Sequence, residues 1–267
     1  MSAFDPDGSG VVVTGAAGGI GAALAKALAA KGARVVVADL NADGVAGTVD
    51  AITAAGGTAF GVAGDAASED GVAALVDAAK GHLGAIDAWY GNAGVDRGRG
   101  LDAAEGDWDL CWQVNVMAHV RAARLLVPDW VAKGAGRYVV TASAAGLLTM
   151  LGAPAYSVTK HGAVAFAEWL SATYRHQGVV VQAICPQGVQ TRMLDDSGPL
   201  KEVLSHDTAL TPEQVADSAI AALAGDEILI LPHPEVGDYY KARAAVPDKW
   251  LAGMNRIQQQ VEAKEGR

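Results

Sequence analysis

Short, continuous apolar runs alternate with helix-forming segments along this chain, and this pattern constrains the fold more than any other feature. The segments 11–15 (VVVTG), 34–40 (RVVVADL) and 179–186 (VVVQAICP) are apolar nearly throughout, not at every second position. Strands have this character when helices cover both faces of a parallel sheet. The segments 20–31 and 154–177 are rich in helix formers. The alternation predicts an α/β fold: a Rossmann-like, doubly wound, seven-stranded parallel sheet with helices on both faces.

The remaining predicted strands complete this sheet, and they cover residues 58–65, 86–94, 136–143 and 227–232. A long helix is predicted over 102–133. No linker, composition break or repeat of 20–50 residues divides the chain. We therefore expect a single domain over 1–267, with a cofactor half at about 8–145 and a catalytic and substrate half at about 146–267.

Composition and charge exclude several classes of function. The chain has 20 basic and 30 acidic residues and a formal charge of −10, which argues against binding nucleic acid or anionic membranes. No apolar stretch reaches membrane-spanning length, and the first ten residues lack the basic start and apolar run of a signal peptide. Cys111 and Cys185 lie in apolar surroundings without a CxxC motif, so we expect buried free thiols, a cytoplasmic location and no metal site.

A glycine-rich turn follows the first predicted strand. In TGAAGGIG (14–21), Gly15, Gly19 and Gly21 permit a tight turn and close approach of a pyrophosphate to a helix N-terminus. Such turns also serve helix–strand packing, so this motif needs support from elsewhere.

That support is Asp39, which closes the second strand 24 residues after Gly15. A carboxylate there can accept hydrogen bonds from the ribose of NAD and repels the 2′-phosphate of NADP. At ~4 Å and an effective dielectric constant near 20, this repulsion has an upper value of roughly 4 kcal/mol. The alternative is a solvated turn residue at the strand end. We predict NAD as the cofactor.

Ser143, Tyr156 and Lys160 form the sharpest catalytic candidate. Tyr156 and Lys160 are four residues apart in PAYSVTK and therefore project from one helix face. A phenol titrates near ~10, but a lysine ammonium and an oxidised nicotinamide, each ~5 Å away, would each favour the phenolate by about 3 kcal/mol. Tyr156 would then take the proton of an alcohol or return it to a ketone. The YxxxK spacing alone is common on half-exposed helices, so it too depends on its companions.

Those companions occur in a familiar order. TGxxxGxG at 14–21, NAG at 92–94, Asn115, Ser143 and YxxxK at 156–160 resemble the short-chain dehydrogenase/reductase family over almost the whole chain. The resemblance implies NAD-dependent interconversion of a secondary alcohol and its ketone. It implies that Asn115 holds a water that links Lys160 to solvent, although a local hydrogen bond is the alternative for Asn115. It also implies that Ser143 binds the substrate oxygen and that Lys160 binds the nicotinamide ribose.

The same resemblance places the cofactor. Asp65 and Ala66 would flank the adenine, residues 92–94 would pack against the adenosine ribose, and residues 186–191 would hold the nicotinamide. The full set of predicted cofactor contacts is Gly15, Gly19, Ile20, Gly21, Asp39, Leu40, Asp65, Ala66, Asn92, Ala93, Gly94, Tyr156, Lys160, Pro186, Val189 and Thr191.

One departure from the family pattern is visible after the sixth strand. The family usually has Pro-Gly there, whereas this chain has Pro186-Gln187-Gly188. The displaced glycine puts the roles of Val189 and Thr191 in doubt. We hypothesise that Gln187 reaches into the substrate pocket.

We expect the substrate pocket to draw on residues 94–100, 144–151 and 187–210, with mostly apolar side chains. The predicted substrate contacts are Ala145, Leu147, Leu148, Met150, Gln187 and Met193, and Leu151, Leu194 and Leu200 lie in the same segments. No arginine is placed for a carboxylate or phosphate, although Arg97, Arg99 and Arg192 are near, so a hydrophobic alcohol or ketone fits best. Core packing is the alternative role for these leucines. The tail 235–267 is expected to cover the pocket or to contact another subunit.

Two alternatives to an alcohol dehydrogenase remain: a reductase of acyl-carrier-protein-linked ketoacyl groups, and a non-catalytic NAD-binding protein. Asp39 and the net charge speak against the first, and the retained Ser143, Tyr156 and Lys160 against the second. The resemblance also implies a homotetramer through helices 102–133 and 154–177. These helices carry large apolar side chains at Trp112, Met117, Val120, Leu125, Phe166, Trp169 and Leu170.

Overall fold

Seven parallel strands form one sheet in a computed structural model that describes residues 3–195 and 209–265. The strand order is β3-β2-β1-β4-β5-β6-β7, with every neighbouring pair parallel. The predicted fold class is therefore confirmed. The strands are β1 (Gly10–Thr14), β2 (Arg34–Asp39), β3 (Thr58–Ala63), β4 (Ala88–Gly91), β5 (Gly136–Thr141), β6 (Val179–Ile184) and β7 (Leu229–Ile230).

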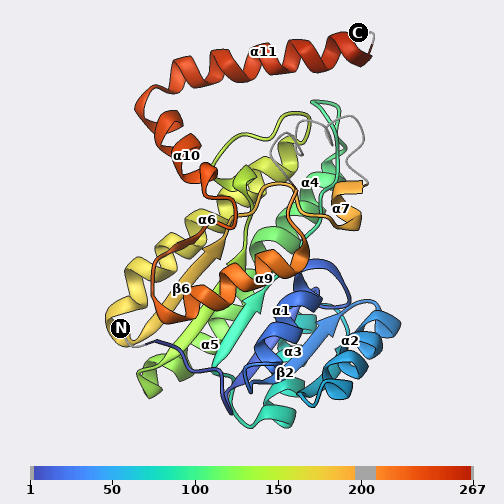
Figure 1. Cartoon of the computed structure of the whole chain (residues 1–267), viewed down its shortest axis with the longest axis vertical. Helices are drawn as coiled ribbons and strands as arrows, with labels where there is room; N and C mark the ends of the chain where they lie inside the picture. The colour runs from blue at the N-terminus through green and yellow to red at the C-terminus, as the bar shows by residue number, and fades with distance from the viewer. Residues whose placement is uncertain (1–2, 196–208, 266–267) are drawn as a thin grey trace.

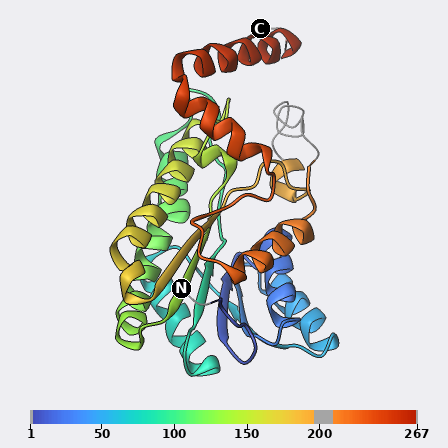
Figure 2. The same ribbon diagram turned by 60° about the vertical axis from the view of Figure 1, so that its left-hand side comes forward.

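Helices cover both faces of this sheet (Figures 1 and 2). They are α1 (Gly19–Ala29), α2 (Ala42–Ala54), α3 (Glu69–Leu83), α4 (Glu105–Trp112), α5 (Ala118–Lys133), α6 (Pro154–Tyr174), α7 (Arg192–Asp195), α9 (Pro212–Ala221), α10 (Glu235–Ala245) and α11 (Pro247–Glu265).

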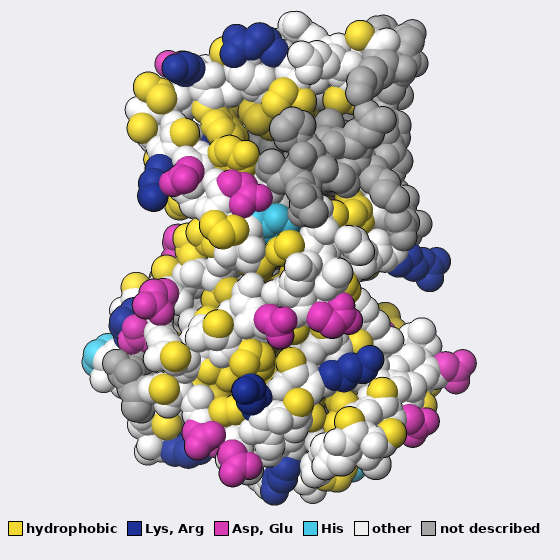
Figure 3. Space-filling view, viewed as in Figure 1, with side chains coloured by type: hydrophobic (Ala, Val, Ile, Leu, Met, Phe, Trp, Pro, Cys, Tyr) yellow, Lys and Arg dark blue, Asp and Glu magenta, His cyan; other side chains and the backbone are white. Residues whose placement is uncertain are grey.

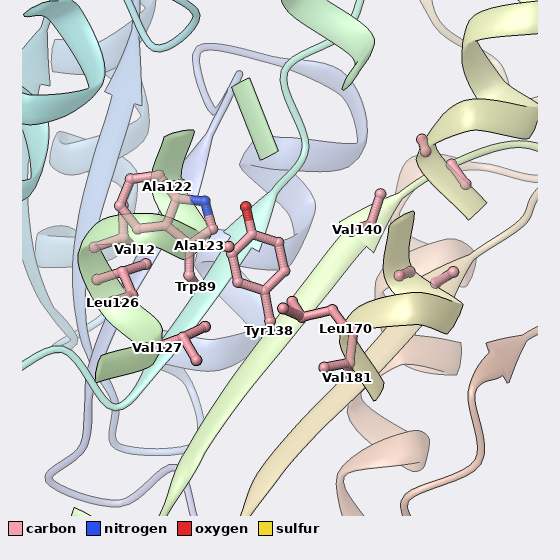
Figure 4. Close-up of a cluster of buried hydrophobic side chains, with 14 of the residues drawn as sticks. Val12, Trp89, Ala122, Ala123, Leu126, Val127, Tyr138, Val140, Leu170 and Val181 are labelled. Atoms are coloured by element: carbon pink, nitrogen blue, oxygen red, sulfur yellow. The ribbon is translucent and has the colours of Figure 1, made fainter. Parts of the chain in front are cut away.

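Alternate residues of each strand enter two separate cores. Val12 and Val36 join the buried cluster that contains α3, α5 and α6, whereas Val11 and Val35 join the cluster that contains α1, α2 and α9. Figure 4 shows the first cluster, where Trp89 and Tyr138 from the sheet meet Leu126 and Val127 of α5. Because side chains point alternately to the two faces of a strand, an apolar run is what a sheet buried on both faces requires.

The predicted helix over 102–133 is interrupted. It begins at Glu105, and a π turn at Gln113–Met117 separates α4 from α5. A π turn inserts one residue into the helical ladder and is frequent at functional sites. Asn115 lies in this turn and is fully buried. The helical pattern in the sequence carries no signal for this insertion.

The tail 235–267 contains two helices, α10 and α11, beyond the carboxyl ends of the strands (Figure 1). Trp250, Met254 and Ile257 fall on one face of α11 at helical spacing; Trp250 and Met254 are partly buried, and Ile257 is exposed. Figure 3 shows apolar side chains gathered beneath α11.

The last strand, β7, has only two residues and is shorter than the predicted strand 227–232. Within residues 3–195 and 209–265, no helix has the length and apolar character needed to cross a membrane.

Candidate active site

A cavity of about 410 Å³ opens at the carboxyl ends of the strands. In an open parallel sheet this is the edge where ligands bind. The cavity brings together most of the residues predicted from the sequence: Gly15, Gly19, Ile20, Asp39, Asn92, Ala93, Gly94, Ser143, Ala145, Leu148, Met150, Tyr156, Lys160, Pro186, Gln187, Val189, Thr191 and Met193. Leu151 and Leu194 also line it, whereas Leu200 lies outside the described residues.

A few predicted residues lie away from this lining. Leu147 is buried in the core cluster of α3, α5 and α6, so core packing is its role and we leave it out of the proposed substrate contacts. Leu40 is exposed beside Asp39. Gly21, Asp65, Ala66 and Asn115 are outside the lining as well.

The glycine-rich turn has the shape that a pyrophosphate needs. Gly15 has a φ of 63°, and a Cβ there would lie 2.8 Å from the Cα of Ala93. Gly19 has a φ of 52°. No side chain caps the N-terminus of α1, so its first N–H groups are available to an anion. The turn therefore fits a dinucleotide phosphate.

Gly21 and Asn92 hold this turn in place. A Cβ at Gly21 would lie 2.2 Å from the carbonyl oxygen of Gly15 and 2.6 Å from Asn92 Nδ2. Asn92 Nδ2 donates hydrogen bonds to the carbonyl oxygens of Thr14 (3.0 Å) and Gly15 (3.2 Å). Gly21 thus permits the close approach of α1 to the turn, and Asn92 fixes the backbone of the turn by hydrogen bonds.

Asp39 accepts a hydrogen bond from the backbone of the glycine-rich turn and also lines the cavity. Its Oδ2 accepts a hydrogen bond from the N–H of Ala17 (3.1 Å), and its Oδ1 accepts one from the N–H of Asn41 (3.0 Å). A carboxylate oxygen has room for a second hydrogen bond, and Asp39 is part of the cavity lining. Binding a ribose and bracing the turn are thus compatible roles.

The loop after β3 begins beside Asp39, because the N–H of Gly64 donates to the carbonyl oxygen of Asp39 (2.9 Å). Asp65 accepts hydrogen bonds there from the N–H groups of Ala67 (2.7 Å) and Ser68 (3.2 Å). Hydrogen bonding from Ser68 is the main cause of a lowered pKa at Asp65. The carboxylate of Asp65 is therefore engaged in shaping the start of α3.

Tyr156 and Lys160 project from the first turns of α6, which begins at Pro154. Lys160 Nζ lies 5.6 Å from the centre of the Tyr156 ring and donates a hydrogen bond to the carbonyl oxygen of Thr141 (2.8 Å). Both side chains are buried in this wall of the cavity.

Burial controls the titration of this pair. Desolvation raises the pKa of Tyr156 to about 12. A hydrogen bond with Ser143 lowers this pKa, but its effect is smaller than that of desolvation. Desolvation lowers the pKa of Lys160 to about 8. The sequence argument predicted that Lys160 and an oxidised nicotinamide together favour the phenolate. In the protein by itself the cost of burying a phenolate exceeds the favourable local interactions, and the effect of the cofactor stays a prediction.

Ser143 stands at the end of β5, across from the first turn of α6. Its Oγ accepts a hydrogen bond from the N–H of Ala145 (3.1 Å), which orients the hydroxyl. With the hydrogen bond to Tyr156, this places two hydroxyl groups where one carbonyl or alcohol oxygen can meet both.

Asn115 holds the loop after β4. Its Oδ1 accepts a hydrogen bond from the N–H of Val95 (2.9 Å), and its Nδ2 donates to the carbonyl oxygen of Val95 (2.9 Å) and to Thr159 Oγ1 (3.1 Å). Asn115 therefore makes the local hydrogen bonds that the sequence analysis gave as the alternative to a water relay. They use both amide hydrogens of Asn115, so a water relay through Asn115 stays a prediction.

The cavity wall also contains Asp96, which sequence reasoning missed, and Met254, which belongs to the tail expected to cover the pocket or to contact another subunit. Asp96 falls in the expected pocket segment 94–100, for which the sequence argument considered apolar contacts and the nearby arginines but no carboxylate. Met254 lies on α11, and its place depends on how the tail folds back.

A hydrogen bond joins the segment after β6 to the segment after β7: the N–H of Gln187 donates to His233 Nδ1 (3.1 Å).

Comparison with known proteins agrees with this geometry. Residues 9–201 match the short chain dehydrogenase family. The chain is 35% identical to the 1-deoxy-11-beta-hydroxypentalenate dehydrogenase of Streptomyces avermitilis over 226 residues, which is 83% of each protein.

Two solved structures share the fold. A short chain dehydrogenase/reductase from Burkholderia phymatum in complex with NAD superposes with a TM-score of 0.84 at 30% identity, covering 92% of this chain and 96% of that one. A 7α-hydroxysteroid dehydrogenase complexed with NADH and 7-oxo glycochenodeoxycholic acid gives 0.79 at 27% identity, covering 84% and 92%. With its sheet order, glycine-rich turn and Ser143/Tyr156/Lys160 arrangement, this chain belongs to the short-chain dehydrogenase/reductase family of oxidoreductases.

Proposed function

We propose that this protein is an NAD-dependent dehydrogenase that interconverts a secondary alcohol and its ketone. The observation that carries the proposal is the meeting of Ser143, Tyr156 and Lys160 in one cavity with the glycine-rich turn and Asp39. The cofactor, when bound, accepts a hydride from the alcohol carbon or delivers one to the ketone carbon.

The residues that would hold NAD are those of the fitted turn and the adjoining loops. The α1 N-terminus faces the pyrophosphate, and Asp39 accepts hydrogen bonds from the adenosine ribose, with Leu40, Asp65 and Ala66 at the adenine edge. Pro186, Val189 and Thr191 adjoin the nicotinamide, and Lys160 binds its ribose. One of the two superposed structures is a complex with NAD and the other a complex with NADH, which supports this choice.

The chain's own groups carry the proton. The phenolate oxygen of Tyr156 takes the alcohol proton during oxidation, and the Tyr156 hydroxyl returns a proton to the ketone oxygen during reduction, while Ser143 holds the substrate oxygen by a hydrogen bond. The ammonium of Lys160 stabilises the phenolate, and this effect strengthens in a site from which water is excluded.

The substrate end of the cavity favours an apolar skeleton. Leu148, Met150, Leu151, Met193, Leu194 and Met254 line it. A panel of secondary alcohols with NAD, followed at the absorbance of the reduced nicotinamide, tests the proposal. NAD reduction that depends on Tyr156 supports it, and a panel without any turnover contradicts it.

We also propose a homotetramer built on α4, α5 and α6. Large apolar side chains on these helices are exposed in the single chain, including Trp112 at 43%, Leu125 at 40% and Trp169 at 56%. Apolar patches of this kind mark interfaces. Sedimentation at micromolar concentration should give four copies for the wild type and smaller species for Trp169→Glu, with Leu101→Glu as the exposed control. A monomeric wild type contradicts the proposal.

A further inference from the structure

Asp96 is a carboxylate in the wall of the cavity, at the end where the chemistry takes place. Asp39 lies beside the glycine-rich turn, whereas Asp96 lies close enough to the catalytic pair to affect its titration. Desolvation is the main cause of the raised pKa of Tyr156 and the lowered pKa of Lys160, and the negative charge of Asp96 adds to the first shift and opposes the second. The neighbouring wall is apolar, with Leu148, Met150 and Leu151 among its side chains. A charge in such surroundings strongly affects which ligands enter.

The loop that carries Asp96 is anchored on both sides. Asn115 binds both backbone groups of Val95, at 2.9 Å each. Cys111 Sγ lies 3.7 Å from the carbonyl oxygen of Arg97, and the N–H of Gly100 donates to the carbonyl oxygen of Gly152 (3.0 Å). The position of Asp96 is therefore built into the fold.

Arg99 supports the carboxylate from the outer side. Its Nη1 lies 2.6 Å from Asp96 Oδ1 and its Nη2 lies 3.0 Å from Asp96 Oδ2. The side chain of Asp96 is 6% exposed and that of Arg99 is 42% exposed, and Arg99 does not line the cavity. A ligand in the cavity thus meets the carboxylate before the guanidinium, and each carboxylate oxygen retains capacity to accept a further hydrogen bond.

We propose that Asp96 selects the substrate: the site takes an uncharged secondary alcohol or ketone with a second hydroxyl group and disfavours analogues that carry a carboxylate. The second hydroxyl donates a hydrogen bond to Asp96, and the apolar wall packs against the carbon skeleton. A substrate carboxylate would instead face a like charge in a poorly solvated site. This inference rests on the proposed dehydrogenase function and specifies its substrate class.

Cyclohexane substrates test the idea on one skeleton. The panel comprises cyclohexanol, the 1,2-, 1,3- and 1,4-diols, and 4-hydroxycyclohexanecarboxylate, each with NAD. For the wild type, we expect kcat/KM for the best diol to exceed that for cyclohexanol by about tenfold. We expect kcat/KM for 4-hydroxycyclohexanecarboxylate to lie at least about tenfold below that for cyclohexanol.

Three variants separate Asp96 from general charge effects. Asp96→Asn should reduce the discrimination between cyclohexanol and the carboxylate by about tenfold. Asp102→Asn makes the same change in net charge at an exposed residue outside the cavity and should leave the ratios unchanged. Arg99→Gln removes the supporting cation and should increase the discrimination against the carboxylate.

The outcomes distinguish the two proposals. Ratios that stay the same in both Asp96→Asn and Arg99→Gln, with cyclohexanol still oxidised, overturn the role of Asp96 and leave the dehydrogenase function intact. If Asp96→Asn does not fold, the direction of the Arg99→Gln effect decides alone. Absence of NAD reduction with every secondary alcohol overturns the proposed function, and this inference with it.

Discussion

Lys160 Nζ donates a hydrogen bond of 2.8 Å to the carbonyl oxygen of Thr141, which joins α6 to the last residue of β5. The buried ammonium is thereby fixed by backbone, since a carbonyl oxygen has no rotamer to lose. Tyr156 lies one turn earlier on the same helix, so the hydrogen bond that fixes the ammonium also fixes where it lies relative to the phenol.

Replacing Tyr156 with Phe should abolish turnover and leave NAD binding intact. The substitution removes one hydroxyl and leaves the glycine-rich turn unchanged. We expect a loss of at least ~100-fold in kcat, which is typical for a lost general acid–base. Steady-state kinetics and NAD titration measure the two effects, and a near-normal rate would remove Tyr156 from its assigned role.

Gly15→Ala should destabilise the protein and weaken NAD binding, whereas Gly18→Ala should do far less to stability. Gly15 has a φ of 63° and a Cβ there would meet Ala93, but a Cβ at Gly18 has nothing within 4 Å. A left-handed backbone with a clash costs on the order of 1–3 kcal/mol. Chemical unfolding of both variants makes the comparison. Equal losses would mean that the turn tolerates a side chain at Gly15.

Asp39→Ala should reduce the preference for NAD over NADP. The variant loses hydrogen bonds to the ribose and the repulsion of a 2′-phosphate, and together these predict a preference of about a hundredfold, or roughly 3 kcal/mol, in the wild type. It also loses the hydrogen bonds to Ala17 and Asn41, so stability should fall.

The ratio of kcat/KM values for the two cofactors separates these effects. Leu40→Arg, added to Asp39→Ala, should raise NADP use further, because arginine pairs with phosphate. An unchanged ratio in Asp39→Ala, with stability lowered, would leave Asp39 only its role in the turn.

The buried His119 should make the fold sensitive to mild acid. Desolvation lowers the pKa of His119 to about 3, and its Nε2 has no hydrogen-bond partner among the described residues. The imidazole stays neutral in the folded protein, while in the unfolded chain it takes up a proton below its ordinary pKa near ~6.5. The free energy of unfolding should therefore fall by up to about 1.4 kcal/mol per pH unit as the pH drops below ~6.5 toward 3.

Denaturant titrations at pH 7.5 and 5.5 check this expectation. His119→Gln should weaken the pH dependence, although it also disturbs packing at Gly91. His176→Gln, at an exposed histidine, serves as the control and should retain the wild-type dependence. A wild-type stability that is flat over this interval contradicts a neutral buried His119.

The order of strands and helices was predictable because apolar runs report burial on both faces. The motif residues were predictable because parallel strands bring their carboxyl ends to one edge. Several features depend on tertiary contacts that the local pattern does not encode. The π turn places the amide of Asn115 where it hydrogen-bonds Val95. Leu147 belongs to the core, after the short turn that follows Ser143.

The raised pKa of Tyr156 shows the same limit. The sequence places a lysine one helical turn away, but it contains no measure of how much water the phenol loses on folding. Asp96 was likewise hidden, because its chemical effect depends on which side Arg99 approaches.

Met254 belongs to α11, whereas every other described residue of the cavity wall lies between Gly15 and Leu194 in the sequence. The glycine-rich turn and the side chains of Ser143, Tyr156 and Lys160 are thus encoded apart from this terminal segment. A change in the terminal helices can therefore alter one wall of the cavity while the residues from the first 194 positions keep their places in the sequence. The same separation makes the terminal helices a natural cassette for exchange between relatives in directed evolution.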